Sequence, residues 1–230
     1  MHSIYNIYIN NLFEYDIVVT DYIFQLGNFL VSVLYLFFDK SKIIFVNNNT
    51  KVFIKETYVY KCPSSKIKPS INLLLDKLKI TNFKPSYTIF KNICLIKTIS
   101  NKKINSPNKS FSNDYNLFFK SLGFEIIFPE ELDVIQLYNI INNCENIILS
   151  WGANSWCNST FVNCKQNVIT LCHIEYANEY NGLKNINDLK NTYTDWTPIC
   201  NKNIMVYDLQ SELTNETKYL LQKKIDELLE

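Results

Sequence analysis

Hydrophobic and polar positions alternate in blocks along the chain, in the order typical of strands followed by helices. Short apolar runs, which predict buried strands, lie at residues 15–21, 42–47, 92–99, 124–128, 146–150, 167–173 and 204–209. Apolar residues at helical spacing lie between or after them, at residues 22–38, 71–80, 113–123, 129–144, 154–162 and 214–230. The alternation is most regular from residue 92 to residue 173. It predicts α/β architecture with a parallel sheet flanked by helices, in which residues 147–149 form a central strand.

The pattern changes near residues 83–90, where we expect a domain boundary. We therefore predict two α/β lobes, residues 1–88 and residues 89–208, followed by a C-terminal helix in residues 209–230. In such sheets ligands bind at the carboxyl ends of the strands, so the site is expected there. The second lobe is predicted to be Rossmann-like, with a parallel sheet.

One segment, residues 22–38, is apolar enough to be considered for a membrane span. It is shorter than the roughly 20 residues that a spanning helix needs, and it contains Gln25, Gly27 and Asn28. A buried helix of an α/β layer is therefore favoured, and no membrane partner is expected. The first residues have no basic region before an apolar core, which argues against a signal peptide and for a cytoplasmic location.

Composition removes several other classes of function. The formal net charge is +1, so no nucleic-acid partner is expected. Every basic residue is lysine, and the 4 glycines are few beside the many asparagines, a bias of AT-rich coding as in some protists and large DNA viruses. The 7 cysteines contain no C-x-x-C pair and lie largely on apolar segments, which predicts reduced core cysteines.

The stretch "LSWGANSWCNSTF" at residues 149–161 predicts a strand, a turn and a helix. Gly152 and Ala153 would allow a close backbone approach, and Asn154 is a good N-cap. A helix N-terminus at such a turn suits a diphosphate, and Trp151 could stack on a base or a sugar. The same pattern is also compatible with ordinary α/β packing. His173, at a predicted strand end, is either a ligand contact or a surface histidine.

Five elements follow one another at the spacing of a known family. They are Lys97 at a strand end, Lys109 with Phe111 and Asn113-Asp114, Gly123-Phe124, "PEELD" at residues 129–133, and the stretch of residues 149–161. In order and spacing they resemble the glycosyltransferases of family 61, the capsular-polysaccharide-biosynthesis type. The chain departs from that family at two histidines, whose places are taken by Trp151 and Asn28, and at two arginines, replaced by lysine. Its asparagine after the turn is Asn158, one residue late.

The resemblance implies a GT-B-like glycosyltransferase that inverts the anomeric centre. It implies a nucleotide-sugar donor and a glycan or glycoprotein acceptor, with the nucleotide-sugar as substrate and no other cofactor. The residues it implies for donor binding are Lys97, Lys109, Asn113, Trp151, Gly152, Ala153, Asn154 and Asn158. GT-B folds often return a C-terminal helix to the first lobe, so Leu220–Leu229 is expected to pack at least partly on residues before Phe83.

Catalysis would need a general base, for which Asp21 is the candidate because it lies at a predicted strand end. No D-x-D pair for a sugar-nucleotide metal is present, in keeping with a metal-independent GT-B enzyme. Because both family histidines are replaced, two alternatives stay open. One is a non-catalytic protein that binds a nucleotide-sugar or a glycan, and the other is an interaction protein without a ligand.

Overall fold

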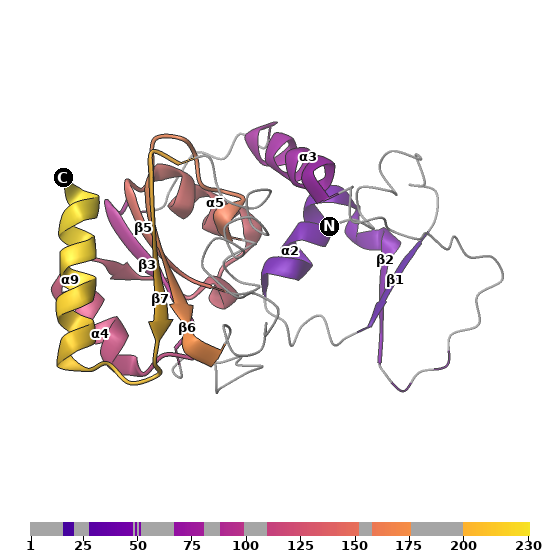
Figure 1. Ribbon diagram of the computed structural model, residues 1–230. Helices are drawn as coiled ribbons and strands as arrows, with labels where there is room; N and C mark the ends of the chain where they lie inside the picture. The colour runs from indigo at the N-terminus through magenta and orange to yellow at the C-terminus, as the bar shows by residue number, and fades with distance from the viewer. Residues whose placement is uncertain are drawn as a thin grey trace. The chain divides into compact units, whose positions relative to one another are not determined.

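The computed structural model (Figure 1) describes residues 16–20, 28–47, 49, 51, 67–80, 88–98, 110–151, 158–175 and 200–230. The chain divides into two compact units. Unit 1 comprises Met1–Pro85 and Glu130–Gln136, and unit 2 comprises Ser86–Pro129 and Leu137–Glu230. Within the described ranges, no helix has the length and apolar character needed to cross a bilayer.

Unit 1 contains a small parallel sheet. Its strands are β1 (Ile17–Thr20) and β2 (Ile43–Val46), which pair in register from Ile17–Ile43 to Thr20–Val46. The helices α2 (Asn28–Phe37) and α3 (Ile67–Ile80) accompany them, with a 3-10 turn η2 (Lys40–Lys42) before β2. The strands and helices predicted here are thus confirmed where they are described. Val33, Leu34 and Phe37 are buried in α2, as expected of a helix in an α/β layer.

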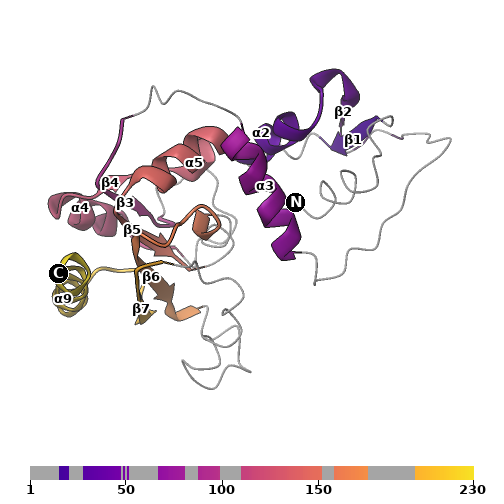
Figure 2. The ribbon, with the colours of Figure 1, turned by 90° about the horizontal axis from the view of Figure 1, so that it is seen from above.

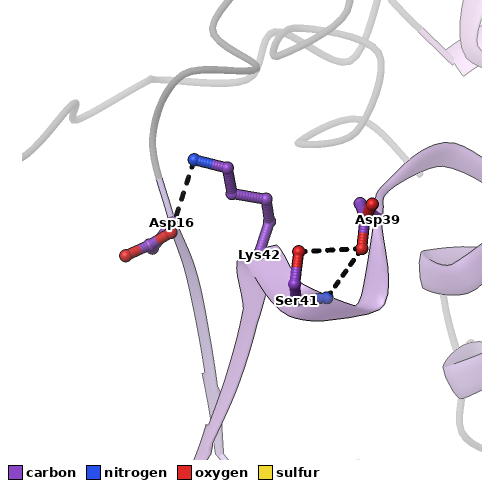
Figure 3. Close-up of polar contacts among 4 residues, drawn as sticks. All are labelled: Asp16, Asp39, Ser41 and Lys42. Atoms are coloured by element: carbon purple, nitrogen blue, oxygen red, sulfur yellow. Dashed lines mark hydrogen bonds and ion pairs between the residues drawn. The ribbon is translucent and has the colours of Figure 1, made fainter.

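The turn into β2 is fixed by a local polar network (Figure 3). Oδ1 of Asp39 accepts hydrogen bonds from the backbone N–H of Ser41 at 2.9 Å and from its hydroxyl at 2.8 Å. The hydrogen bond from the Ser41 N–H is the main reason that the pKa of the Asp39 carboxyl lies below its usual value. Beside it, the Lys42 ammonium lies 3.8 Å from a carboxylate oxygen of Asp16, next to the start of β1.

Unit 2 is built on a parallel sheet of five strands. They are β3 (Asn92–Leu95), β4 (Glu125–Ile126), β5 (Asn146–Ser150), β6 (Asn167–His173) and β7 (Lys202–Leu209), in the order β4-β3-β5-β6-β7. All four neighbouring pairs are parallel. The prediction of a parallel α/β sheet with residues 147–149 in its central strand is therefore confirmed.

Helices cover both faces of this sheet (Figure 2). The helices α4 (Asn113–Ser121) and α9 (Asn215–Leu229) lie on one side, and α5 (Val134–Asn143) lies on the other. The face under α4 and α9 forms a continuous core with apolar residues from both helices and four strands. Its fully buried members include Cys94, Phe111, Tyr115, Phe119, Phe124, Ile148, Ile169, Leu171, Leu221, Ile225 and Leu228.

Two helix ends follow recognisable local rules. Helix α4 ends at Gly123, whose φ of +83° is the left-handed conformation that closes a helix, as the sequence predicts. Helix α5 begins later than Pro129, the predicted start. Pro129–Glu131 forms a 3-10 turn, η5. The helix proper is capped by Asp133, whose carboxylate accepts from Gln136 N–H at 2.8 Å while the Gln136 side chain accepts from Asp133 N–H at 3.0 Å.

The terminal helix differs from its prediction in which of its residues are buried. Leu221, Ile225 and Leu228 form the buried stripe, whereas Leu220 and Leu229 are 39% and 49% exposed. The stripe belongs to the core under α4 and α9, and the earliest residue of that cluster in the chain is Cys94. This packing lies within unit 2; the expectation that α9 also packs on residues before Phe83 concerns the other unit and stays a prediction.

Candidate functional site at the sheet switch point

The order of the strands defines one special position at the carboxyl edge of the unit 2 sheet. From β3 the chain passes to β4 on one side, whereas from β5 it passes to β6 and β7 on the other side. The connections that leave β3 and β5 thus run in opposite directions. In doubly wound sheets ligands bind outside the carboxyl ends of the strands at such a switch point. This position is therefore the candidate site.

Main-chain pairing between β3 and β5 ends at this position, and the two strands diverge. The last paired residues are Leu95 and Leu149. Beyond them the backbone N–H of Lys97 donates to the side-chain Oγ of Ser150 at 2.8 Å. The extension of β3 then turns to the chain before α4, since the Lys97 carbonyl accepts from Phe111 N–H at 3.0 Å. The extension of β5 stays with β6, because Trp151 N–H donates to the Leu171 carbonyl at 2.7 Å.

Lys97 follows the end of β3 and lies directly at the switch point. Its backbone is held on both sides, by Ser150 and by Phe111, and its side chain is half-buried. The ammonium lies close enough to His173 to contribute to the lowered pKa of that imidazole. Lys97 therefore presents a positive charge from a fixed backbone, which suits an anionic ligand.

Trp151 takes a packing position. Its side chain is 5% exposed and forms a small cluster with Cys172, against which Met205 and Tyr207 pack. In this arrangement the indole has little free face on which a base or a sugar could stack. The packing interpretation of Trp151 accounts for its contacts.

Asn158 has the opposite character. It is 1% exposed, and its Nδ2 has no hydrogen-bond partner among the described residues. A buried amide without a partner costs about 1–3 kcal/mol, so it needs an explanation. Asn158 lies on the connection that leaves β5, the strand whose carboxyl end forms one side of the switch point.

Asn113 is the exposed first residue of α4, on the connection that leaves β3. The residue before it, Ser112, is the N-cap of that helix, but its hydroxyl makes no capping bond. The Ser112 Oγ is buried and has no hydrogen-bond partner in the part of the chain that the structure describes, and the Ser112 backbone N–H donates to the Ser211 carbonyl at 2.7 Å. Ser112 is not among the residues predicted for the site, although a serine before Asn113-Asp114 is an ordinary N-cap signal.

His173 is neither a surface histidine nor placed to contact a ligand through its ring nitrogens. It is 2% exposed, and Nδ1 accepts from Glu175 N–H at 3.2 Å. The hydrogen of the neutral ring is therefore on Nε2, which donates to Ser211 Oγ at 2.8 Å. Burial is the main cause that lowers the pKa of His173; Glu175 opposes it and Lys97 adds to it. Its role is structural.

The other predicted site residues lie outside the described residues. These are Asp21, Lys109, Gly152, Ala153 and Asn154. The structure thus locates four of the predicted residues on the connections that leave β3 and β5 (Lys97, Asn113, Trp151 and Asn158), and it adds Ser150 at the end of β5 and Ser112 before α4.

The described ranges contain no group of three or more His, Cys, Asp or Glu side chains that could hold a metal ion. Cys94, Cys144 and Cys172 are free and buried. Burial raises the pKa of the Cys144 and Cys172 thiols to about 12, which keeps both protonated near neutral pH. They act as core residues, as the sequence predicts.

A hollow of about 360 Å³ lies at the opposite edge of the sheet, where β3 and β4 begin. It is lined by Ile89, Phe90, Lys91, Asn92, Lys120, Gly123, Phe124 and Glu125. Its two lysines come from the chain before β3 and from the last turn of α4. This hollow is the natural rival location for an anion when the switch point is tested.

Comparison with known proteins adds no assignment. No family model matches the chain. No curated protein matches its sequence either.

Proposed function

We propose that this protein binds a nucleotide-sugar at the switch point of the unit 2 sheet and transfers the sugar to a glycan or glycoprotein acceptor. The observation that carries the proposal is the fixed position of Lys97 where β3 and β5 separate. A lysine held there supplies positive charge for the diphosphate of the donor at the place where such sheets bind ligands. The order and spacing of residues 97–161 favour a glycosyltransferase among the proteins that bind this class of ligand.

Two further features support a ligand at the carboxyl edge. The unpartnered amide of Asn158 offers donors, and the N-terminus of α4 adds free N–H groups beside the unpartnered Ser112 hydroxyl. The charge at this edge is mixed, because Glu175 lies close enough to raise the pKa of His173. A neutral or singly charged group of the donor beside the diphosphate would fit such a mixture.

The remaining parts of the mechanism are proposals of the same standing. The fold would be GT-B-like, with unit 1 as the acceptor-side lobe, and transfer would be inverting and metal-independent. Asp21 would deprotonate the acceptor hydroxyl as general base. Lys109 and the turn of Gly152, Ala153 and Asn154 would contact the diphosphate, whose charge a helix N-terminus stabilises.

A non-catalytic nucleotide-sugar-binding protein is the second candidate. It is favoured by one observation: both ring nitrogens of His173, one of the chain's two histidines, are bonded to groups of the protein itself. A transferase that uses histidine as its base would have to use the other one. Binding without turnover across donors would select this candidate.

Calorimetry with UDP and GDP tests the proposal. Lys97→Ala is expected to weaken the affinity about tenfold or more, or roughly 1.4 kcal/mol. The matched control is Lys120→Ala, which removes a lysine from the hollow at the opposite edge and should leave the affinity unchanged. Loss of affinity in the Lys120 variant alone would move the site to that hollow. If the wild-type protein binds neither nucleotide, the proposed function is wrong.

A further inference from the structure

We infer that Ser150 is a positioning residue for the ligand site: its hydroxyl sets the place of Lys97 where β3 and β5 separate. The inference rests on the proposed function and deepens it, since it assigns the residue that makes Lys97 available to a diphosphate. Ser150 is the last residue of β5 and is 2% exposed.

Ser150 is unusual for its position. The three residues before it in β5, Ile147 to Leu149, are buried aliphatic residues. Its register partner on β6 is Leu171, which is also buried and aliphatic. An aliphatic side chain would suit these surroundings. A buried hydroxyl is costly unless it is hydrogen-bonded, and Oγ of Ser150 accepts from Lys97 N–H at 2.8 Å.

This bond takes over where the main-chain ladder stops. Pairing of β3 with β5 ends at Leu95–Leu149, so a side-chain oxygen continues the contact one step further. A side-chain acceptor reaches farther from its own backbone than a carbonyl does. It can therefore satisfy the Lys97 N–H while the two main chains move apart, which a regular ladder does not allow.

The segment beyond Lys97 is held from the other side. Thr98 forms a parallel bridge with Phe111, and its Oγ1 accepts from the Asn116 amide at 3.0 Å. Thr98 is fully buried. Lys97 is thus clamped between Ser150 on β5 and the start of α4, so that its side chain projects from a backbone fixed to both sides of the switch point.

The consequence for binding is preorganisation. A lysine whose backbone is already in place loses less freedom when it meets a diphosphate than one on a loose connection. Without the Ser150 hydroxyl, the Lys97 N–H loses its acceptor and the segment is released from β5. The ammonium would then be less well placed relative to groups on the connection that leaves β5.

The experiment is a double-mutant cycle on UDP affinity, measured by calorimetry with the full chain. Ser150→Ala is expected to weaken binding about tenfold, and in the Lys97→Ala background it should cause no further loss, because it acts through Lys97. Thr170→Val, which removes a buried hydroxyl from neighbouring β6, is the control and should bind UDP as the wild type does. Ser150→Cys is a second variant that keeps the shape of the side chain but has a weak acceptor, and it should show the same loss as Ser150→Ala.

The outcomes separate the inference from the proposed function. If the wild type binds UDP and both Ser150 variants, shown folded by thermal unfolding, bind it equally well, the positioning role is wrong and the proposed function stands. Equal losses in the wild-type and Lys97→Ala backgrounds would also overturn it, since they would mean that Ser150 acts through general stability. If the wild type binds neither UDP nor GDP, the proposed function fails and the inference fails with it.

Discussion

The side-chain amide of Asn146 donates to Oδ1 of Asn92 at 2.8 Å across the amino ends of β5 and β3. The same bond recurs along the edge of the sheet, from Asn167 to Asn146 at 2.9 Å and from Asn201 to Asn167 at 2.8 Å. The four amides form one chain of side-chain hydrogen bonds. Because Asn92, Asn146 and Asn167 are also register partners, the chain favours this register over a slip by one residue.

Replacing Asn146 should therefore lower the stability of the protein. Asn146→Ala removes a donor and an acceptor at a position that is 3% exposed, and it leaves groups of Asn92 and Asn167 unpaired. We expect a loss of about 1–3 kcal/mol in the free energy of unfolding, measured with urea. Asn203→Ala, at an exposed position of β7, is the control and should stay within about 0.5 kcal/mol of the wild type. Equal stability of the two variants would show that the amide chain contributes nothing.

The stability of the protein should fall in mild acid because of His173. Burial lowers the pKa of its imidazole in the folded protein, so the unfolded chain binds a proton at a higher pH than the folded protein does. Stability is thus retained above the unfolded pKa of about 6.5 and is lost as the pH falls from there toward the folded pKa. Protonation would also end the acceptance by Nδ1 of the Glu175 N–H and place a positive charge near Lys97.

Thermal unfolding of the wild type and of His173→Gln between pH 8 and pH 5 measures this effect, over a range that spans the usual histidine pKa of about 6.5. The variant is expected to be less stable at pH 8, because it loses the bond to Ser211, but less dependent on pH. Parallel curves for the two proteins would assign the acid sensitivity to other groups.

Gly123 offers a test of backbone conformation alone. Its φ is +83°, and a Cβ built at this position meets no atom within 4 Å. Gly123→Ala should therefore cost about 1–2 kcal/mol through the left-handed conformation and nothing through a clash. Gly123→Asn should cost less, since asparagine tolerates this conformation better. If the alanine variant unfolds at the same urea concentration as the wild type, the end of α4 has relaxed to another conformation.

Gln166 holds the end of α5, and its loss should be among the more damaging single changes. Its side-chain amide is 2% exposed and donates to the carbonyls of Ile141 and Cys144, while its Oε1 accepts from Asn163 N–H at 2.8 Å. Gln166→Ala leaves these groups buried without partners, for which we expect a loss of about 2–4 kcal/mol in urea unfolding.

Gln166→Glu should be worse near neutral pH, because a carboxylate cannot donate to the two carbonyls. The control is Gln222→Ala on α9. It removes an exposed amide that donates to the Asp226 carboxylate at 2.9 Å, and it should leave the free energy of unfolding nearly unchanged. A neutral Gln166→Ala would show that water replaces the side chain at this helix end.

The strands of unit 2 could be predicted because each is a short apolar run with polar residues on either side, and alternation with helices makes them parallel. The start of α5 could have been predicted as well. Asp133 and Gln136 stand at the spacing of a capping box, but the proline at position 129 led to a predicted start five residues too early. Leu221, Ile225 and Leu228 also show the spacing of one face, which Leu220 and Leu229 do not share.

What could not be predicted is which surface each element packs on and which polar residue meets which. An apolar stripe on a helix does not indicate which surface it packs on, so the packing of α9 on the unit 2 sheet could not be predicted from the sequence. Ser150 and Asn146 look like ordinary strand ends until pairing brings them opposite Lys97 and Asn92. Lys97 itself was predicted from the order and spacing that residues 97–161 share with a known family, in which it stands at a strand end.

The place of α9 in the core has a consequence for the protein while it is being made. Residues 92–209 hold every strand of the sheet, yet one face of that sheet is completed by Leu221, Ile225 and Leu228. During translation the sheet leaves the ribosome before the helix that covers it. The nascent chain therefore carries an open apolar surface over β6 and β7 until α9 has been synthesised, and at that stage such a surface is prone to aggregation.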